Sequence, residues 1–251
     1  MRLKAVVLAV FALLLFAVPA WAITYGQPDG NRHPNVGALV GTYDGQSYPY
    51  CSGTLISPTV FLTAAHCAED SPTVYVTFDS EYTSRAKLYR GTFYGDPRYT
   101  WSQDDPHDIA VVVFDKPIRG ITPARLPRRG QLDGLKQTQQ FTAVGYGSQE
   151  AVNQPGGPVN AYYDIREYAV SSFNALGPAY LRLSQNQATG DGGTCYGDSG
   201  GPNFLGAGST ETNVIAGTTI TGDWFCKATN VTYRLDTEAA RSFLGQFVTL
   251  P

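Results

Sequence analysis

The sequence predicts an all-β fold, and three observations carry this prediction. Short runs of β-branched and aromatic residues recur between turns, as in 36–41, which precedes Asp44-Gly45, and in 74–78. Residues 109–114 form an apolar run rich in valine, which is typical of a strand buried on both faces. Apolar residues at helical spacing occur only near the C-terminus, at Ala239, Ala240, Phe243, Leu244 and Phe247.

Length and charge predict one globular unit with a substantial core. The chain has 251 residues, a formal net charge of -3 and 16% charged residues. Nothing in this composition suggests a nucleic-acid binder, and the mild acidity implies no particular partner.

The N-terminus predicts a secretory signal peptide over residues 1–22. Arg2 and Lys4 precede the apolar run 5–18, and the small residues of Pro19-Ala20-Trp21-Ala22 suit a cleavage site. The run is shorter than the roughly 20 residues of a membrane-spanning helix. We therefore expect a secreted protein that begins at Ile23 and has no membrane association after cleavage.

A nucleophile is predicted at Ser199, in the run Gly197-Asp198-Ser199-Gly200-Gly201-Pro202. A serine hydroxyl needs a base that takes its proton and donors that stabilise the resulting oxyanion. Glycine permits backbone angles through which the N–H groups of Gly197 and Ser199 can form such an oxyanion hole. We expect His66 to be the base, because histidine exchanges protons near neutral pH, and Asp108 to orient it.

Other orders of serine-hydrolase residues fit less well. The Gly-x-Ser-x-Gly pattern also matches α/β-hydrolases, but those need a histidine after the serine, and none follows Ser199. A subtilisin-like order would place an acid before His66, at Asp29 or Asp44, within a parallel α/β chain that this strand-rich sequence does not resemble.

Four segments in this order resemble the secreted chymotrypsin-like serine peptidases, the family that also contains trypsin. They are Cys51–Ser57, Thr63–Cys67, Asp108–Val112 and Gly197–Pro202. The resemblance implies two antiparallel six-stranded Greek-key barrels with a C-terminal helix, and a Ser199–His66–Asp108 catalytic triad.

These expectations divide the chain into four parts after the signal peptide. We expect an N-terminal barrel over 23–116 with His66 and Asp108, and a proline-rich connection over 117–130. A C-terminal barrel with Ser199 over 131–235 and a helix over 236–251 would follow.

Four cysteines in a secreted chain predict two disulfides, with three connectivities open. The resemblance implies that Cys51 pairs with Cys67 and Cys195 with Cys226. The cysteine spacings fit no common zinc pattern, so we expect no metal and no cofactor.

The resemblance also implies an activating contact between the freed ammonium of Ile23 and Asp198. We expect signal cleavage alone to release this ammonium. The alternative is that Ile23 only starts a strand and that backbone N–H groups satisfy Asp198.

The substrate pocket is expected to include Gly193, Thr194, Gly222 and Val231. Trypsin-like members carry an aspartate where Gly193 stands, so the resemblance implies a roomy, uncharged pocket for large apolar or aromatic side chains. Asp223 lies close by, and its carboxylate would still admit basic groups.

The predicted function is that of a monomeric, secreted serine endopeptidase whose partners are polypeptide substrates and protein inhibitors. The alternatives are a catalytically silent binding protein of the same fold and an esterase that uses the same triad. Of the remaining histidines, we expect His33 to lie exposed in a loop and His107 to be structural.

Overall fold

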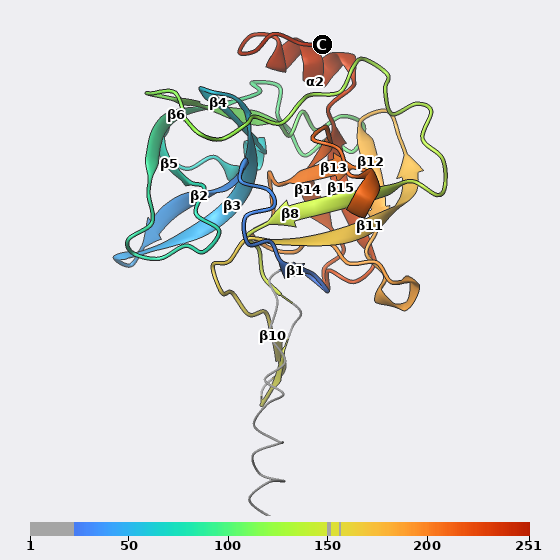
Figure 1. The fold of residues 1–251 in the computed structure, drawn as a ribbon, viewed down its shortest axis with the longest axis horizontal. Helices are drawn as coiled ribbons and strands as arrows, with labels where there is room; N and C mark the ends of the chain where they lie inside the picture. Colours follow the sequence, from blue (N-terminus) through green and yellow to red (C-terminus); the bar gives the residue numbers. More distant parts are fainter. Residues whose placement is uncertain (1–22, 150–151, 156) are drawn as a thin grey trace, which may run out of the picture.

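The computed structural model describes residues 23–149, 152–155 and 157–251, which form two β-barrels side by side (Figure 1). The predicted signal peptide lies outside the described residues. Each barrel has six antiparallel strands, and the α-helix of this part of the chain, α2 (Glu238–Leu244), follows the second barrel. The predicted fold class is confirmed. Within the described ranges, no helix is long and apolar enough to cross a membrane.

The first barrel is made of β2 (Val36–Tyr43), β3 (Gln46–Ser57), β4 (Val60–Thr63), β5 (Thr73–Thr77), β6 (Tyr89–Gly95) and β7 (Ala110–Phe114). Its strands pair in the closed order β2-β3-β4-β7-β6-β5. The β2–β3 turn is Asp44-Gly45, and both residues have positive φ angles, 50° and 76°. Such angles suit the two-residue hairpin turns that follow the twist of the strands.

The second barrel is made of β8 (Gln140–Gly145), β11 (Glu167–Leu176), β12 (Tyr180–Ser184), β13 (Pro202–Leu205), β14 (Ile215–Gly222) and β15 (Thr229–Arg234). Its strands pair in the order β11-β12-β15-β14-β13-β8, and pairing of β11 with β8 closes it. The short strand β1 (Gln27–Pro28) joins the edge of β11. A separate hairpin is formed by β9 (Val152–Gln154) and β10 (Gly157–Val159).

The C-terminal helix is shorter than the 236–251 segment assigned to it from the sequence. Thr237 caps its start, since its hydroxyl accepts a hydrogen bond of 3.2 Å from the N–H of Ala240. Ala240, Phe243 and Leu244 are buried against the core. The helix ends at Leu244, and Gly245, a residue of low helix propensity, is its C-cap.

Arg166, completely buried just before β11, joins the two barrels. Its guanidinium donates to the carbonyls of Val36 and Phe78 in the first barrel at 2.9 and 3.0 Å. It also donates to the carboxylate of Asp29 at 2.7 Å, so the buried charge is paired. The N-terminal segment is thereby fixed at the junction of the barrels.

The expected exposure of His33 is wrong, because only 6% of its surface is accessible. Its ring stacks on Phe204 and lies between two carboxylates, those of Asp29 and Glu211, with the Glu211 oxygen 2.7 Å from Nε2. Burial alone would lower the pKa of His33, but these two hydrogen bonds raise it above its ordinary value. The loop containing His33 is therefore an anchor of the N-terminal segment.

Candidate active site

The pairing of β4 with β7 brings His66 and Asp108 together. Thr63, at the end of β4, lies opposite Ala110, at the start of β7. His66 follows in the short 3-10 turn η1 (Ala65–Cys67), and Asp108 precedes β7 by two residues. Two segments distant in the chain therefore deliver the imidazole and the carboxylate to the same end of the first barrel.

Asp108 holds the imidazole through both of its oxygens. Oδ2 lies 2.7 Å from Nδ1 of His66, and Oδ1 accepts a hydrogen bond of 3.0 Å from the His66 backbone N–H. The aspartate side chain is 4% exposed and that of the histidine 19%. A carboxylate only accepts, so this contact suits the tautomer of a neutral imidazole that carries its proton on Nδ1 and keeps a free lone pair on Nε2. This is the tautomer that a base facing a serine needs.

Ser199 lies against the first barrel next to the segment that contains His66, since its carbonyl oxygen is 3.8 Å from Sγ of Cys67. The Ser199 carbonyl accepts a hydrogen bond of 2.7 Å from the N–H of Ser52 on β3. Next to it, Gly200 has a φ of +82°, and any Cβ there would collide with the hydroxyl of Thr63. Among the described residues the Ser199 hydroxyl makes no hydrogen bond, as is common for nucleophiles without bound substrate.

The backbone N–H groups of Gly197 and Ser199 are both unused within the described part of the chain. The carbonyl of Tyr196 accepts from Ser148 N–H at 2.7 Å, and that of Asp198 accepts from Gly201 N–H at 2.8 Å. In a trans peptide the N–H points opposite to the carbonyl, so these bonds direct the two N–H groups away from the protein interior. Gly197 has a φ of +95°, which only glycine adopts easily.

Asp198 is a completely buried carboxylate with neutral partners. Its two oxygens accept hydrogen bonds of 2.8 Å from the N–H groups of Gly147 and Cys195. Burial raises its pKa to about 7, and these two hydrogen bonds only partly oppose that shift. The carboxylate sits in a space in which a Cβ at Gly145 or Gly147 would collide with it. Within the described residues, the carboxylate of Asp198 thus has two backbone N–H groups as partners and no cation.

Ile23 is inaccessible to solvent. The next residue, Thr24, exchanges two backbone hydrogen bonds with Gly193, of 2.9 and 3.0 Å. Ile23 has a φ of 58°, which is unfavourable for a β-branched residue joined to a preceding carbonyl. A free amino group has no such carbonyl, so cleavage before Ile23 would remove this strain.

A cavity of about 490 Å³ lies beside Ser199. Of the expected pocket residues, Thr194 and Gly222 line it, whereas Gly193 and Val231 do not. The space that a side chain at position 193 would occupy is filled by the buried Gln185.

Asp223 lines the same cavity, but its carboxylate is used in a turn. It accepts backbone hydrogen bonds from Lys227, Ala228 and Thr229 at 3.1, 2.8 and 2.8 Å. Burial alone would raise its pKa, but these bonds hold the pKa below the ordinary value. The exposed aromatic rings of Tyr196 and Trp224 lie beside this turn, with their centroids 6.1 Å apart.

The structure pairs Cys51 with Cys67 and Cys195 with Cys226. The first bridge fixes the turn of His66 to β3, and the second fixes the serine segment to the wall of the cavity. The sulfurs of Cys51 and Cys67 lie near the His66 ring. Because both are oxidised, they offer no thiolate to a metal ion at that position.

Several contributors to this site were not among the sequence-predicted residues. Ser52 donates its hydroxyl to the Gly197 carbonyl at 3.0 Å and accepts from the N–H of Tyr146 at 3.0 Å. Ser148 and Gln185 act through tertiary contacts for which the sequence holds no local signal. For Ser52 a signal exists, since it lies inside the Cys51–Ser57 segment.

Comparisons with known proteins agree with the geometry. The family model described as Trypsin matches residues 28–240. A protein named chymotrypsin, from Phaedon cochleariae, is 26% identical over 266 residues, which cover 91% of this chain and 92% of that protein. A trypsin of the same organism is 26% identical over 75% of this chain and 82% of its own length. The thrombin-like enzyme elegaxobin-1 of Protobothrops elegans is 28% identical over 61% of this chain and 68% of its own length.

Proposed function

This chain belongs to the trypsin family of serine peptidases, and we propose that it is an active, secreted endopeptidase. The observation that carries the proposal is the pairing of a buried Asp108 with His66 beside Ser199, next to two unused N–H groups. A silent binding protein of this fold would have no need to keep all of these groups. Two disulfides suit an oxidising, extracellular environment.

In the proposed reaction, the hydroxyl oxygen of Ser199 attacks the carbonyl carbon of the scissile peptide bond. Its proton passes to Nε2 of His66, and Asp108 stabilises the imidazolium that forms. The oxyanion accepts hydrogen bonds from the N–H groups of Gly197 and Ser199. The imidazolium then gives its proton to the leaving nitrogen, and the C–N bond breaks to leave an acyl-enzyme.

Water completes the cycle. His66 takes a proton from the water, whose oxygen attacks the acyl carbon, and the ester bond to Ser199 breaks as the serine oxygen regains a proton. Each step needs the imidazole to exchange protons at Nε2 alone. The contact of Asp108 with Nδ1 supports this arrangement because it holds the other nitrogen.

Activation is proposed to require the freed ammonium of Ile23. Asp198 is a buried carboxylate with no cation among its contacts in the described part of the chain, and Ile23 is buried at the start of a segment that pairs with Gly193. An ammonium beside Asp198 would stabilise its ionised form and, with it, the backbone of 196–199. We propose that signal peptidase cleavage after Ala22 supplies this ammonium directly.

For the cleaved bond, we propose a preference for large apolar or aromatic side chains. The cavity beside Ser199 contains one carboxylate, that of Asp223, whose oxygens are used by three backbone N–H groups. The aromatic rings of Tyr196 and Trp224 add apolar surface near its opening. The names of the relatives point both ways, since a chymotrypsin and a trypsin match with equal identity.

Hydrolysis of peptide amides tests this proposal. Purified protein that starts at Ile23 should cleave a peptide anilide with Phe before the scissile bond faster than the matching Arg and Ala substrates. Ser199→Ala should lower kcat by several orders of magnitude without changing the unfolding midpoint. Turnover of small esters with no turnover of any amide would favour the esterase instead.

A further inference from the structure

A second cavity lies between the connection of the two barrels and the C-terminal segment. Its volume is about 890 Å³, larger than that beside Ser199, and the two cavities share no lining residue. The C-terminal segment contributes residues 248–251, and the chain between the barrels contributes Ala124, Arg125, Leu126, Arg128, Arg129 and Gln131. None of the groups that line it takes part in the proposed reaction.

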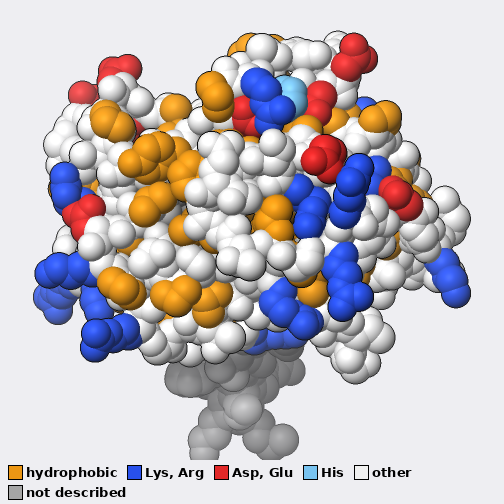
Figure 2. All heavy atoms as spheres, turned by 90° about the horizontal axis from the view of Figure 1, so that it is seen from above, with side chains coloured by type: hydrophobic (Ala, Val, Ile, Leu, Met, Phe, Trp, Pro, Cys, Tyr) orange, Lys and Arg blue, Asp and Glu red, His pale blue; other side chains and the backbone are white. Residues whose placement is uncertain are grey.

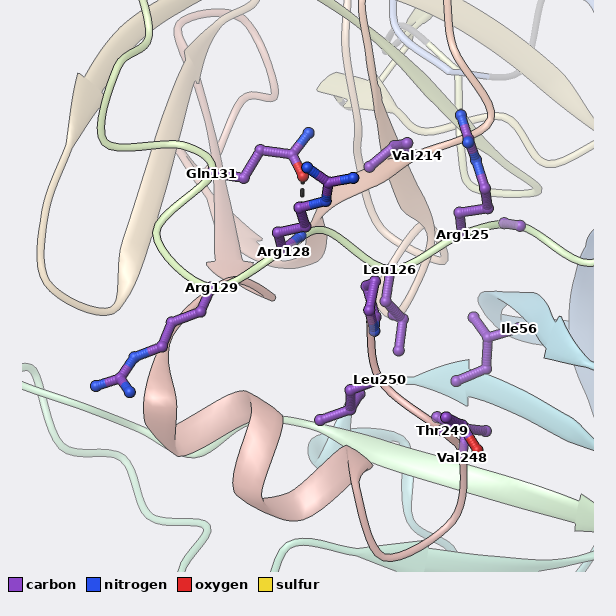
Figure 3. Close-up of a pocket in the computed structure, with 12 residues that line it drawn as sticks. Ile56, Arg125, Leu126, Arg128, Arg129, Gln131, Val214, Val248, Thr249 and Leu250 are labelled. Atoms are coloured by element: carbon purple, nitrogen blue, oxygen red, sulfur yellow. Dashed lines mark hydrogen bonds between the residues drawn. The ribbon is translucent and has the colours of Figure 1, made fainter.

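The floor of this cavity is apolar. In Figure 3, Leu126 and Ile56 extend toward the same space as Leu250, and Val214 lies farther along it. Ile56, Leu126 and Val214 are each only 9% exposed, so most of each side chain packs against the protein. A ligand that fills the cavity would bury aliphatic surface, which is favourable in water.

The rim of this cavity is cationic. Arg125, Arg128 and Arg129 all line it and are all exposed. Within the described residues, Arg125 and Arg128 make no salt bridge, and Arg129 has a 3.3 Å contact with Glu238 between two largely exposed side chains. Exposed pairs of this kind contribute little, so all three guanidinium groups are available to an anion.

The three arginines are distributed around the cavity instead of converging on one point. Arg125 and Arg129 lie at opposite sides in Figure 3, with Arg128 between them. The backbone N–H of Arg128 donates to the side chain of Gln131 at 2.8 Å, which holds this turn in place. Figure 2 views the molecule from the end that has α2, where Lys and Arg side chains lie among hydrophobic ones.

We infer that this cavity binds an acidic, aliphatic segment of a partner protein. One compact anion could not contact arginines on opposite sides, whereas carboxylates spaced along a peptide could pair with each. A sulfated polysaccharide would match the charges but would leave the apolar floor without a partner. An extended peptide that alternates acidic and aliphatic side chains matches both the cationic rim and the apolar floor. The cationic rim stands out because the chain as a whole, with a net charge of -3, is unfavourable to acidic partners.

The test measures binding of a fluorescein-labelled peptide that alternates Glu and Leu to full-length Ser199→Ala protein, by fluorescence anisotropy at physiological salt. The Ser199→Ala background prevents cleavage, so the result is independent of the proposed peptidase function. The double variant Arg125→Glu/Arg128→Glu should raise Kd at least about tenfold, because two attractive contacts become repulsive. The matched control is Arg119→Glu, an exposed arginine of the same connection that does not line the cavity.

The control should change Kd less than about twofold, since a charge outside the cavity acts on the peptide only through a screened field. Leu250→Asn should also weaken binding, and a peptide that alternates Gln and Leu should bind more weakly than the Glu peptide. Equal Kd values for the double variant and the control would overturn the inference. So would tighter binding of heparin that Leu250→Asn leaves unchanged, because a polysaccharide would then be the better occupant.

Discussion

Blocking the amino group of Ile23 should make the stability of the folded protein fall steeply with rising pH. The perturbation is a single alanine added before Ile23, which turns the ammonium into a neutral amide. Without a cation nearby, Asp198 has a pKa of about 7 in the fold, against 3.8 for an ordinary aspartate. One pKa unit corresponds to about 1.4 kcal/mol, so ionising the unpaired carboxylate costs about 4 kcal/mol.

The direction in which the free energy of unfolding changes with pH follows from proton binding. The folded-state pKa is raised, so between 3.8 and about 7 the folded state holds a proton that the unfolded state has lost. The free energy of unfolding therefore decreases with rising pH across this window and is lowest above it. From about pH 5 to about pH 7.5 the extended protein should lose about 3 kcal/mol relative to the protein that starts at Ile23.

Urea unfolding of the two forms at about pH 5 and about pH 7.5 measures this difference. Ile23→Val with a free amino group is the matched control, because it keeps the ammonium and a β-branched side chain. The extended form should also show a lower kcat/KM than the protein that starts at Ile23, since an Asp198 without an ammonium beside it no longer holds the 196–199 backbone in place. A stability difference between the two forms that is the same at both pH values would refute the reasoning.

Two further predictions concern a glycine and a histidine. Gly197→Ala should lower kcat about 100-fold with little change in KM. Alanine resists a φ of +95° and its Cβ would crowd Gly147, so the N–H of the oxyanion hole has to move. Unchanged kcat for an anilide substrate would contradict this prediction. His33→Gln should remove a pH dependence of the free energy of unfolding. The pKa of His33 is raised in the folded protein, so the histidine stabilises the fold fully below its ordinary pKa. This stabilisation is lost as the pH rises through the raised pKa. Unfolding free energies of the two proteins should therefore converge at alkaline pH, and a constant gap from acid to alkaline pH would count against the Asp29–His33–Glu211 clamp.

The sequence is most informative where local patterns encode the structure. The valine run became β7, Asp44-Gly45 became a hairpin turn, and the two segments around Thr63 and Asp108 met through strand pairing. These features depend on periodicity and turn chemistry, which a single sequence displays directly. The same holds for Gly197 and Ser199, since the glycine-rich run itself allows their N–H groups to be free.

Local sequence patterns could not predict contacts between side chains that lie apart in the sequence. His33 is buried because Glu211, 178 residues away, supplies its second carboxylate, and no local signal near His33 indicates this. Gln185 occupies the space beside Gly193 through the packing of a different strand end. Tertiary packing, and not residue type, decided these two environments. Asp223 differs, because its carboxylate accepts from backbone N–H groups of the turn that follows it directly in the chain.

Fluorophosphonate labelling followed by peptide mass spectrometry tests the central claim most directly. On folded protein that starts at Ile23, we expect a single adduct on Ser199, lost in His66→Ala and retained in a charge-reversed Arg119→Glu control. An adduct on another serine, or none on folded protein with the Ile23 terminus, would contradict an activated Ser199 and favour a binding protein with a peptidase fold.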